Sequence, residues 1–278
     1  MPTITSTDLR RRMEKIADLP TLPQIVQRLV AASNRPDSSA EELGRIVEKD
    51  QAMAAKVLKL ANSPYYGFPS RIASVSHAVV ILGLNVVKRM ALCASVFDMM
   101  KSAGLDQLWR HSLGVAMTAH TLATRAKLPH PEEVFAAGLL HDLGYVALHV
   151  KAPDLAAQII LEMQSSSRSR AEIEQAVVGA THAEIAGWLA DNWKLPITLK
   201  DPMMYHHHPT LAREATSQTA IVHIADVLVK AMGCGSSDNQ PVTDLSPEAW
   251  ELLHLDDAAL DACIEIAARD FESIDDLL

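Results

Sequence analysis

Aromatic residues, cysteines and long apolar runs are all scarce in this chain of 278 residues. Phe, Trp and Tyr together make up 4% of the sequence, and few segments alternate apolar with polar residues, so a β protein is not expected. The three cysteines are far apart and form no Cys-x-x-Cys unit, which argues against both a disulfide framework and a cysteine metal site. The longest apolar stretch, residues 77–100, is interrupted by Asn85, Lys88, Arg89 and Asp98, so no membrane span is predicted.

A basic surface is lacking as well. The net charge is −9 and the isoelectric point about 5.7, so nucleic acid, which needs a basic face, is not expected as a partner. The charge is uneven: residues 1–100 hold 13 Lys/Arg and 9 Asp/Glu, whereas residues 101–278 hold 12 and 25. This opposite balance suggests two lobes. Arg10-Arg11-Arg12 is followed by charged residues rather than by an apolar core, so no secretory signal is predicted and we expect a cytoplasmic protein.

Helix-forming residues dominate what is present. Ala, Leu, Met and Glu are abundant and apolar residues recur at helical spacing, which predicts an all-α, two-lobed helical bundle. Ser39 and Glu42 form the pattern of a capping box, and Asp50 is expected to cap the next helix. We predict an N-terminal helical lobe over residues 1–103 and a second helical lobe over residues 104–232. Residues 233–278 are expected to form a flexible loop and acidic C-terminal helices that pack on the second lobe.

One stretch pairs a histidine with a carboxylate. The apolar run from Val134 to Leu140 predicts a helix that delivers His141 and Asp142 side by side, and Gly144 is the type of residue at which a helix ends. Neighbours on a helix diverge by about 100°, so both side chains reach one ion only if it lies beside the helix end. The pair therefore suggests a metal held by an imidazole and a carboxylate.

The other histidines gather in the same half of the sequence. Ten of the twelve lie between His111 and His223, in or beside apolar helical patterns, as expected of a metal site. A single histidine on an apolar helix is more often a hydrogen-bonded core residue, and we give His120, His149 and His223 that interpretation.

Several separated motifs resemble those of one known family. The first half of the chain contains Leu19-Pro20-Thr21-Leu22-Pro23, Asp50, Lys56-Val57-Leu58-Lys59-Leu60-Ala61-Asn62-Ser63, Tyr65-Tyr66-Gly67, Ala78-Val79 and Leu82-Gly83. The second half continues with the His141-Asp142 pair, Trp193-x-Leu195-Pro196 and His206-His207-x-Pro209. In this order the motifs resemble the HDOD output domain of bacterial signalling proteins, from about Leu19 to Asp226.

The resemblance implies a metal site, because HDOD domains are related to the HD phosphohydrolases. The ligands carried over from the motifs are His111, His141, Asp142, His182, His206, His207 and Asp226. So many imidazoles with two carboxylates suit a dinuclear iron or manganese site, with zinc as an alternative, better than a magnesium site. If the protein is an enzyme, the resemblance implies that Asp142 bridges the two ions and is the catalytic residue.

Two departures from the hydrolytic relatives bear on activity. Those relatives carry a lysine three residues after the Asp of the pair, where this chain has Tyr145, so the expected cation is missing. Relatives that cleave cyclic dinucleotides carry Gly-Tyr-Pro after the paired histidines, and some carry a Glu where this chain has Gln107. Here Pro209-Thr210-Leu211 follows His208. Activity on a cyclic dinucleotide is therefore not expected.

Three functions remain as hypotheses. The first is a signalling module that contacts a protein partner through its N-terminal lobe, where Tyr65 and Tyr66 could supply an interface. The second is a metal-dependent phosphohydrolase that acts on a phosphomonoester or a nucleotide. The third is a metal- or redox-sensing protein in which the centre changes how the lobes pack.

Overall fold

The computed structural model describes residues 24–33, 39–63, 71–233 and 244–255, together with residues 258, 261, 262, 264 and 265. Within these ranges the regular structure is helical and contains no strand, which confirms the all-α prediction. The Leu19–Pro23 motif, the Tyr65-Tyr66 pair and most of the expected acidic C-terminal helices lie outside the described residues.

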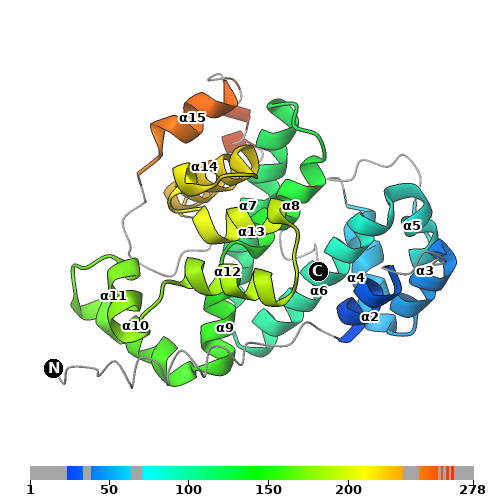
Figure 1. Ribbon diagram of the computed structural model, residues 1–278, viewed down its shortest axis with the longest axis horizontal. Helices are drawn as coiled ribbons and strands as arrows, with labels where there is room; N and C mark the ends of the chain where they lie inside the picture. Colours follow the sequence, from blue (N-terminus) through cyan, green and yellow to red (C-terminus); the bar gives the residue numbers. More distant parts are fainter. Residues whose placement is uncertain are drawn as a thin grey trace.

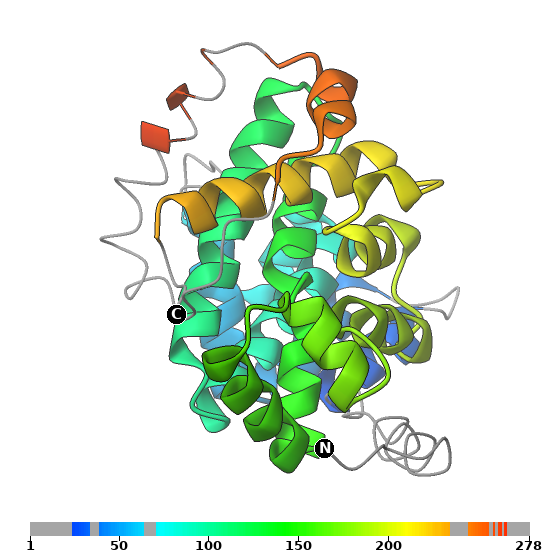
Figure 2. The same cartoon turned by 90° about the vertical axis from the view of Figure 1, so that its left-hand side faces the viewer.

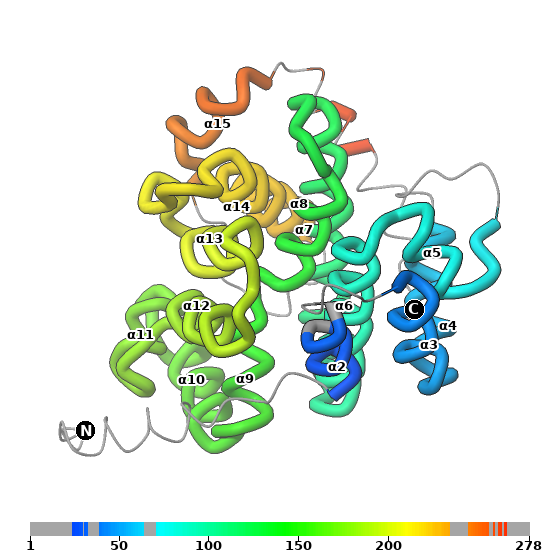
Figure 3. Tube along the Cα trace, turned by 45° about the vertical axis from the view of Figure 1, so that its right-hand side comes forward, coloured from blue at the N-terminus to red at the C-terminus, as the bar shows by residue number. Residues whose placement is uncertain are grey.

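The first group of helices forms the N-terminal lobe, drawn in blue and cyan in Figure 1. It consists of α2 (Gln24–Ser33), α3 (Ala40–Glu48), α4 (Gln51–Ala61), α5 (Val75–Leu82) and α6 (Leu84–Ser102). The Ser39 hydroxyl accepts from the Glu42 N–H, and the Asp50 carboxylate accepts from the Met53 N–H, so both predicted caps form. Helix α6 packs on α2, α4 and α5 and also on α7, α8 and α9 of the next group. It therefore lies between the two lobes, as Figure 3 shows.

The second group forms the C-terminal lobe. It consists of α7 (Asp106–Arg125), α8 (Pro131–Leu140), α9 (Leu143–Lys151), α10 (Pro153–Ser165), α11 (Arg170–Val177), α12 (His182–Asn192), α13 (Ile197–Tyr205), the short 3-10 helix η1 (Pro209–Leu211) and α14 (Thr216–Ala231). Helix α7 is buried along much of its length, and α8 and α14 pack on it, while α13 packs on α8 and α14. Figure 2 shows α14 crossing this group, with α15 (Pro247–Leu253) above it. Helix α15 contacts α14 and η1.

The lobe boundaries remain a prediction, although the helices are consistent with a change near residue 103. Helix α6 ends at Ser102, Gly104 adopts φ +70°, and α7 begins at Asp106. A salt bridge of 2.9 Å joins Arg89 on α6 to Glu133 on α8, beside a groove of about 400 Å³.

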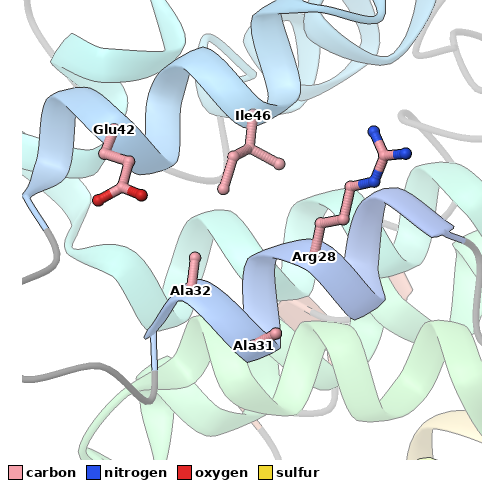
Figure 4. A pocket seen from close by; sticks show the side chains of 5 residues that line it. All are labelled: Arg28, Ala31, Ala32, Glu42 and Ile46. Atoms are coloured by element: carbon pink, nitrogen blue, oxygen red, sulfur yellow. The ribbon is translucent and has the colours of Figure 1, made fainter.

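A second groove lies inside the N-terminal lobe, between α2 and α3. It has a volume of about 310 Å³ and is shown in Figure 4. Ala32 and Ile46 lie between the two helices, whereas Arg28 and Glu42 are at opposite ends of the groove. The residues that line this groove include none of the histidines that the sequence analysis identified as candidate ligands. No helix among the described residues combines the length and the apolar character needed to cross a membrane.

Candidate metal centre

The predicted His-Asp pair lies at a junction between two helices. Helix α8 ends at Leu140, His141 is its C-terminal cap residue, and Asp142 precedes α9. The chain bends here, so the two neighbouring side chains converge, with His141 Nε2 and Asp142 Oδ2 3.2 Å apart. Convergence beside a helix end is the arrangement that the sequence predicted.

The prediction that Gly144 marks the end of a helix was wrong. Gly144 does not end a helix but lies in the first turn of α9, where α9 packs against α12. A Cβ atom at this position would lie 1.9 Å from the backbone oxygen of His182. The residue is therefore required by the close approach of two helices, because no side chain fits between them.

All seven residues predicted as ligands come together in space. They are supplied by α7, the α8–α9 junction, the start of α12, the segment after α13, and α14. His111 is 4% exposed, Asp142 3% and His182 2%, and His207 alone among the seven is half-buried. Their separation in sequence, from residue 111 to residue 226, is closed by the packing of these helices.

Asp142 divides the cluster into two sets. Its Oδ2 atom faces His141 at 3.2 Å and His111 at 3.8 Å. Its Oδ1 atom faces His182 at 3.4 Å and His206 at 3.6 Å. Asp226 completes the first set, with Oδ1 3.0 Å from His111 Nε2, and His207 completes the second, with Nε2 3.0 Å from His182 Nε2. Each oxygen of the Asp142 carboxylate therefore faces a different set of imidazoles.

Hydrogen bonds of Nδ1, on the side of the ring away from the cluster, fix the ring orientation of three histidines. Nδ1 of His141 donates to the Gly138 carbonyl oxygen at 2.7 Å, and Nδ1 of His206 donates to the Met203 carbonyl oxygen at 3.2 Å. Nδ1 of His182 lies 2.8 Å from a carboxylate oxygen of Glu174. Because carbonyl oxygens only accept, the Nδ1 atoms of His141 and His206 carry the proton in this arrangement. Nε2 is then the ring nitrogen that faces the cluster and is available as a metal ligand.

Glu174 is a residue that sequence reasoning missed. This buried carboxylate on α11 accepts from both the backbone N–H and Nδ1 of His182, each at 2.8 Å. It therefore holds the tautomer and the position of His182 without entering the cluster. Only the helix–turn–helix connection from α11 to α12 brings the two together, and the sequence signal that could have marked this turn is the capping box of Thr181 and Glu184.

The charges in the cluster shift its pKa values in opposite directions. Burial lowers the pKa of His141, but Asp142 and Asp226 outweigh it and raise this pKa to about 10. Burial raises the pKa of Asp142, but His141 and other histidines outweigh it and hold this pKa well below its usual range. Burial and the neighbouring His182 lower the pKa of His207 to about 3. Asp142 and His207 are thus in the unprotonated form that binds a metal, whereas His141 would release a proton when an ion binds.

The hydrogen bonding of the atoms that face into the cluster indicates whether these residues fit a metal. Buried atoms without a hydrogen-bond partner among the described residues include His111 Nε2, His141 Nε2, His206 Nε2, Asp142 Oδ1 and Asp226 Oδ1. A buried polar group without a partner is costly, and these five atoms converge. Three sets have ligand atoms within 4.8 Å of one another: His111 with His141 and Asp226, His141 with Asp142 and His206, and His182 with His206 and His207. The donor set fits divalent ions.

Tyr145 occupies the position at which a lysine was expected from the hydrolytic relatives. Its ring stacks on His182 with centroids 3.9 Å apart, and the Arg170 guanidinium carbon lies 4.4 Å from the Tyr145 ring centroid. Burial raises the pKa of Tyr145 well above its usual value, so the phenol stays neutral. A second cation, Lys230, lies 2.7 Å from Asp226 Oδ2. The side chain at position 145 is uncharged, but positive charge is nevertheless present nearby.

The three histidines assigned to the core make other contacts. His149 Nδ1 donates to the Tyr145 carbonyl oxygen, and the half-buried ring of His120 lies edge-on to Phe135. His223 Nδ1 donates to the His206 carbonyl oxygen, while its Nε2 accepts from the Ser246 N–H. His223 therefore supports the backbone of a residue in the cluster, although its own ring nitrogens are engaged elsewhere.

Known proteins resemble this chain in sequence and fold. The model of the HDOD domain family matches residues 19–209. An HDOD domain protein of unknown function from Geobacter sulfurreducens is 27% identical, with 97% of this chain and 94% of that chain covered and a TM-score of 0.70. A protein from Shewanella amazonensis SB2B with the provisional name of a phosphohydrolase is 23% identical, with 96% and 98% covered and a TM-score of 0.69. At that identity the second likeness concerns the fold alone.

A longer relative also matches. An uncharacterized protein of Treponema pallidum (strain Nichols) is 25% identical over an alignment of 228 residues, with 78% of this chain and 43% of that protein covered. The chain thus spans less than half the length of this relative.

Proposed function

The chain belongs to the HDOD domain family, and from this membership and the buried cluster we propose that it is a regulatory protein that carries a dinuclear metal centre. The observation that carries the proposal is the convergence of buried imidazole and carboxylate atoms without hydrogen-bond partners among the described residues. His111, His141, Asp142 and Asp226 would hold one ion. Asp142, His182, His206 and His207 would hold the other. Iron or manganese suits this donor set, with zinc as the alternative.

Burial supports a regulatory role over rapid turnover. Six of the seven residues in the cluster are buried, and Tyr145 stacks on His182 at the edge where His207 is half-buried. Ligands contributed by separate helices make the packing of the C-terminal lobe depend on the metal, because a bound ion stabilises only the folded arrangement. Loss or oxidation of the ions would then alter how the lobes pack. A metal- or redox-sensing role is included in this proposal.

The output would pass to a protein partner through the N-terminal lobe, which contacts the C-terminal lobe mainly through α6. Exposed Val80 and Ile81 on α5 offer apolar contact area in that lobe.

A phosphohydrolase is the second candidate, and Lys230 and Arg170 near the cluster favour it. A bound divalent ion would supply Lewis acidity toward a phosphoryl oxygen. The protein's own residues would contribute by holding Asp142 unprotonated and by fixing the imidazole tautomers. Phosphate release that requires Asp142 would distinguish an enzyme from a purely regulatory protein.

Elemental analysis of anaerobically purified full-length chain tests the proposal. We expect about two iron, manganese or zinc ions per chain, as the two sets of ligands require. Asp142→Ala should lose both ions, because this carboxylate faces both sets. His149→Ala is the matched control, since this histidine lies on the adjoining helix α9 and its Nδ1 donates to a backbone carbonyl. Wild-type protein without metal, or full metal content in Asp142→Ala, would refute the proposal.

A further inference from the structure

Two cations from different helices reach the half-exposed edge of the cluster. Lys230 extends from α14, with Nζ 2.7 Å from Asp226 Oδ2 and its side chain 26% exposed. Arg170 is the first residue of α11, and its guanidinium carbon lies 4.4 Å from the Tyr145 ring centroid. Both residues are half-buried, unlike the interior of the cluster.

Arg170 is held in a defined orientation. Its Nε donates to Met163 Sδ at 3.1 Å, and its planar group lies over the Tyr145 ring, which in turn stacks on His182. The guanidinium, the phenol ring and the imidazole ring thus form a stack that runs from the edge of the site to His182, a residue of the cluster. A guanidinium whose plane is fixed in this way loses little further freedom when it binds a ligand with two oxygens.

Lys230 is held on the outer side of Asp226. Its Nζ contacts Oδ2, whereas Oδ1 of the same carboxylate faces His111 and His141. Lys230 is also close enough to Arg170 for the two positive charges to act on each other.

The charge balance favours an anion once the centre is loaded. Two divalent ions carry more positive charge than Asp142 and Asp226 neutralise, and Lys230 and Arg170 add to the excess. An ion held by Asp226 would neutralise this carboxylate, so Lys230 could attract another negative group. A dianion with several acceptor oxygens matches both the point charge of a lysine and the fork of an arginine.

We propose that Arg170 and Lys230 form a binding site for a phosphate dianion at the half-exposed edge of the cluster. The ligand is either inorganic phosphate or the phosphate of a phosphomonoester. The site supplies, from α11 and α14, the positive charge that position 145 lacks. The proposal rests on the metal centre proposed above and adds the residues that select the ligand.

Calorimetric titration of the metal-loaded full chain with inorganic phosphate tests this site. Charge-assisted hydrogen bonds to phosphate are strong, so Arg170→Gln should weaken phosphate binding by about tenfold or more with metal content unchanged. Lys230→Gln should have a similar effect, and Arg170→Lys should fall between wild type and Arg170→Gln. The matched control is Arg168→Gln, because this arginine is two residues away and pairs with Glu162 at 2.6 Å.

The outcomes separate this proposal from the one on which it rests. Metal-loaded wild type that binds no phosphate, or Arg170→Gln that binds it as tightly as wild type, overturns the phosphate site and leaves the metal centre standing. Wild type without metal instead refutes the proposed function. Arg170→Gln leaves every residue named as a ligand in place, so this variant decides even if Lys230→Gln loses metal. Tighter binding of a nucleoside monophosphate than of phosphate identifies a phosphomonoester ligand, and equal binding identifies inorganic phosphate.

Discussion

The two lobes bury different kinds of side chain. In the described part of the N-terminal lobe the buried polar residues are Ser63 and Ser95, and ion pairs such as Lys56–Asp98 lie at or near the surface. The buried histidines and carboxylates of the described chain all belong to the C-terminal lobe. They are His111, His141, Asp142, Glu174, His182, Asp201, His206, His223 and Asp226.

This difference indicates where function has been favoured over stability. An apolar core stabilises a helical lobe without electrostatic compensation, whereas buried ionisable groups cost several kcal/mol unless they are paired. Asp201 is paired, because it accepts from the N–H groups of Glu214 and Ala215. The convergent atoms of the cluster lack such partners in the described chain, and a bound ion is the compensation that their chemistry fits.

The largest expected effect separates packing from metal binding. A Cβ at Gly144 would meet the His182 backbone, and a Cβ at Gly44 would meet Ser76, including its Cα at 2.6 Å. Each Gly→Ala change should destabilise the protein by about 3 kcal/mol in urea unfolding, because helices must move apart. Only Gly144→Ala should also reduce the metal content, since it displaces His182. Equal metal loss in Gly44→Ala would mean that the two lobes are not independent.

The next effect is a pH dependence of the metal-free protein. The pKa of His207 is lowered to about 3 in the folded state, whereas an unfolded histidine binds a proton below about 6.5. The unfolded state therefore gains protons first, and stability falls by about 1 kcal/mol per pH unit below 6.5. His141 acts in the opposite window: its raised pKa of about 10 gives stability that is full below 6.5 and is lost as pH rises toward 10.

Thermal unfolding of the metal-free protein from pH 4.5 to 9 measures this dependence. We expect a maximum near pH 6.5, with a shallower acid limb in His207→Gln. His77→Gln, on an exposed position of α5, is the control from the other lobe. An unchanged acid limb in His207→Gln would contradict the assignment.

The smallest effects concern ion pairs outside the cluster. Glu133→Ala removes the half-buried pair with Arg89 that joins α6 to α8, and should cost about 1 kcal/mol. Glu41→Ala removes a pair with Arg45 that is exposed within α3, and should cost about 0.5 kcal/mol or less. Chemical denaturation distinguishes the two. A larger cost for Glu41→Ala would show that the contact between the lobes contributes little.

Local patterns were sufficient to predict the helices. Ser39 and Asp50 cap helices as expected, because a cap depends on residues within one turn. The ends of helices are less predictable: α7 ends at Arg125, and Lys127, two residues later, adopts a positive φ. Such boundaries depend on backbone geometry that spacing alone does not determine.

The sequence was sufficient to name the candidate ligands of the cluster, but not the residues that contact those ligands from outside. The resemblance to the HDOD family named the seven residues, and the structure brings them together. Glu174 and Arg170 had no sequence signal of their own, because their relation to His182 and Tyr145 arises from the packing of α11. Lys230 could have been noticed, since it lies four residues after Asp226 on one helix face. Gly144 was misinterpreted because spacing does not distinguish a helix end from a close helix contact.

The imidazole of His223 has a mechanical consequence. Its Nδ1 donates a hydrogen bond to the carbonyl oxygen of His206, and its Nε2 accepts one from the N–H of Ser246, the N-cap residue of α15. The start of α15 is thereby positioned by the same peptide unit that carries a cluster ring. A small shift of that peptide would therefore reach α15 through one rigid ring, along a path much shorter than the chain between residues 206 and 246.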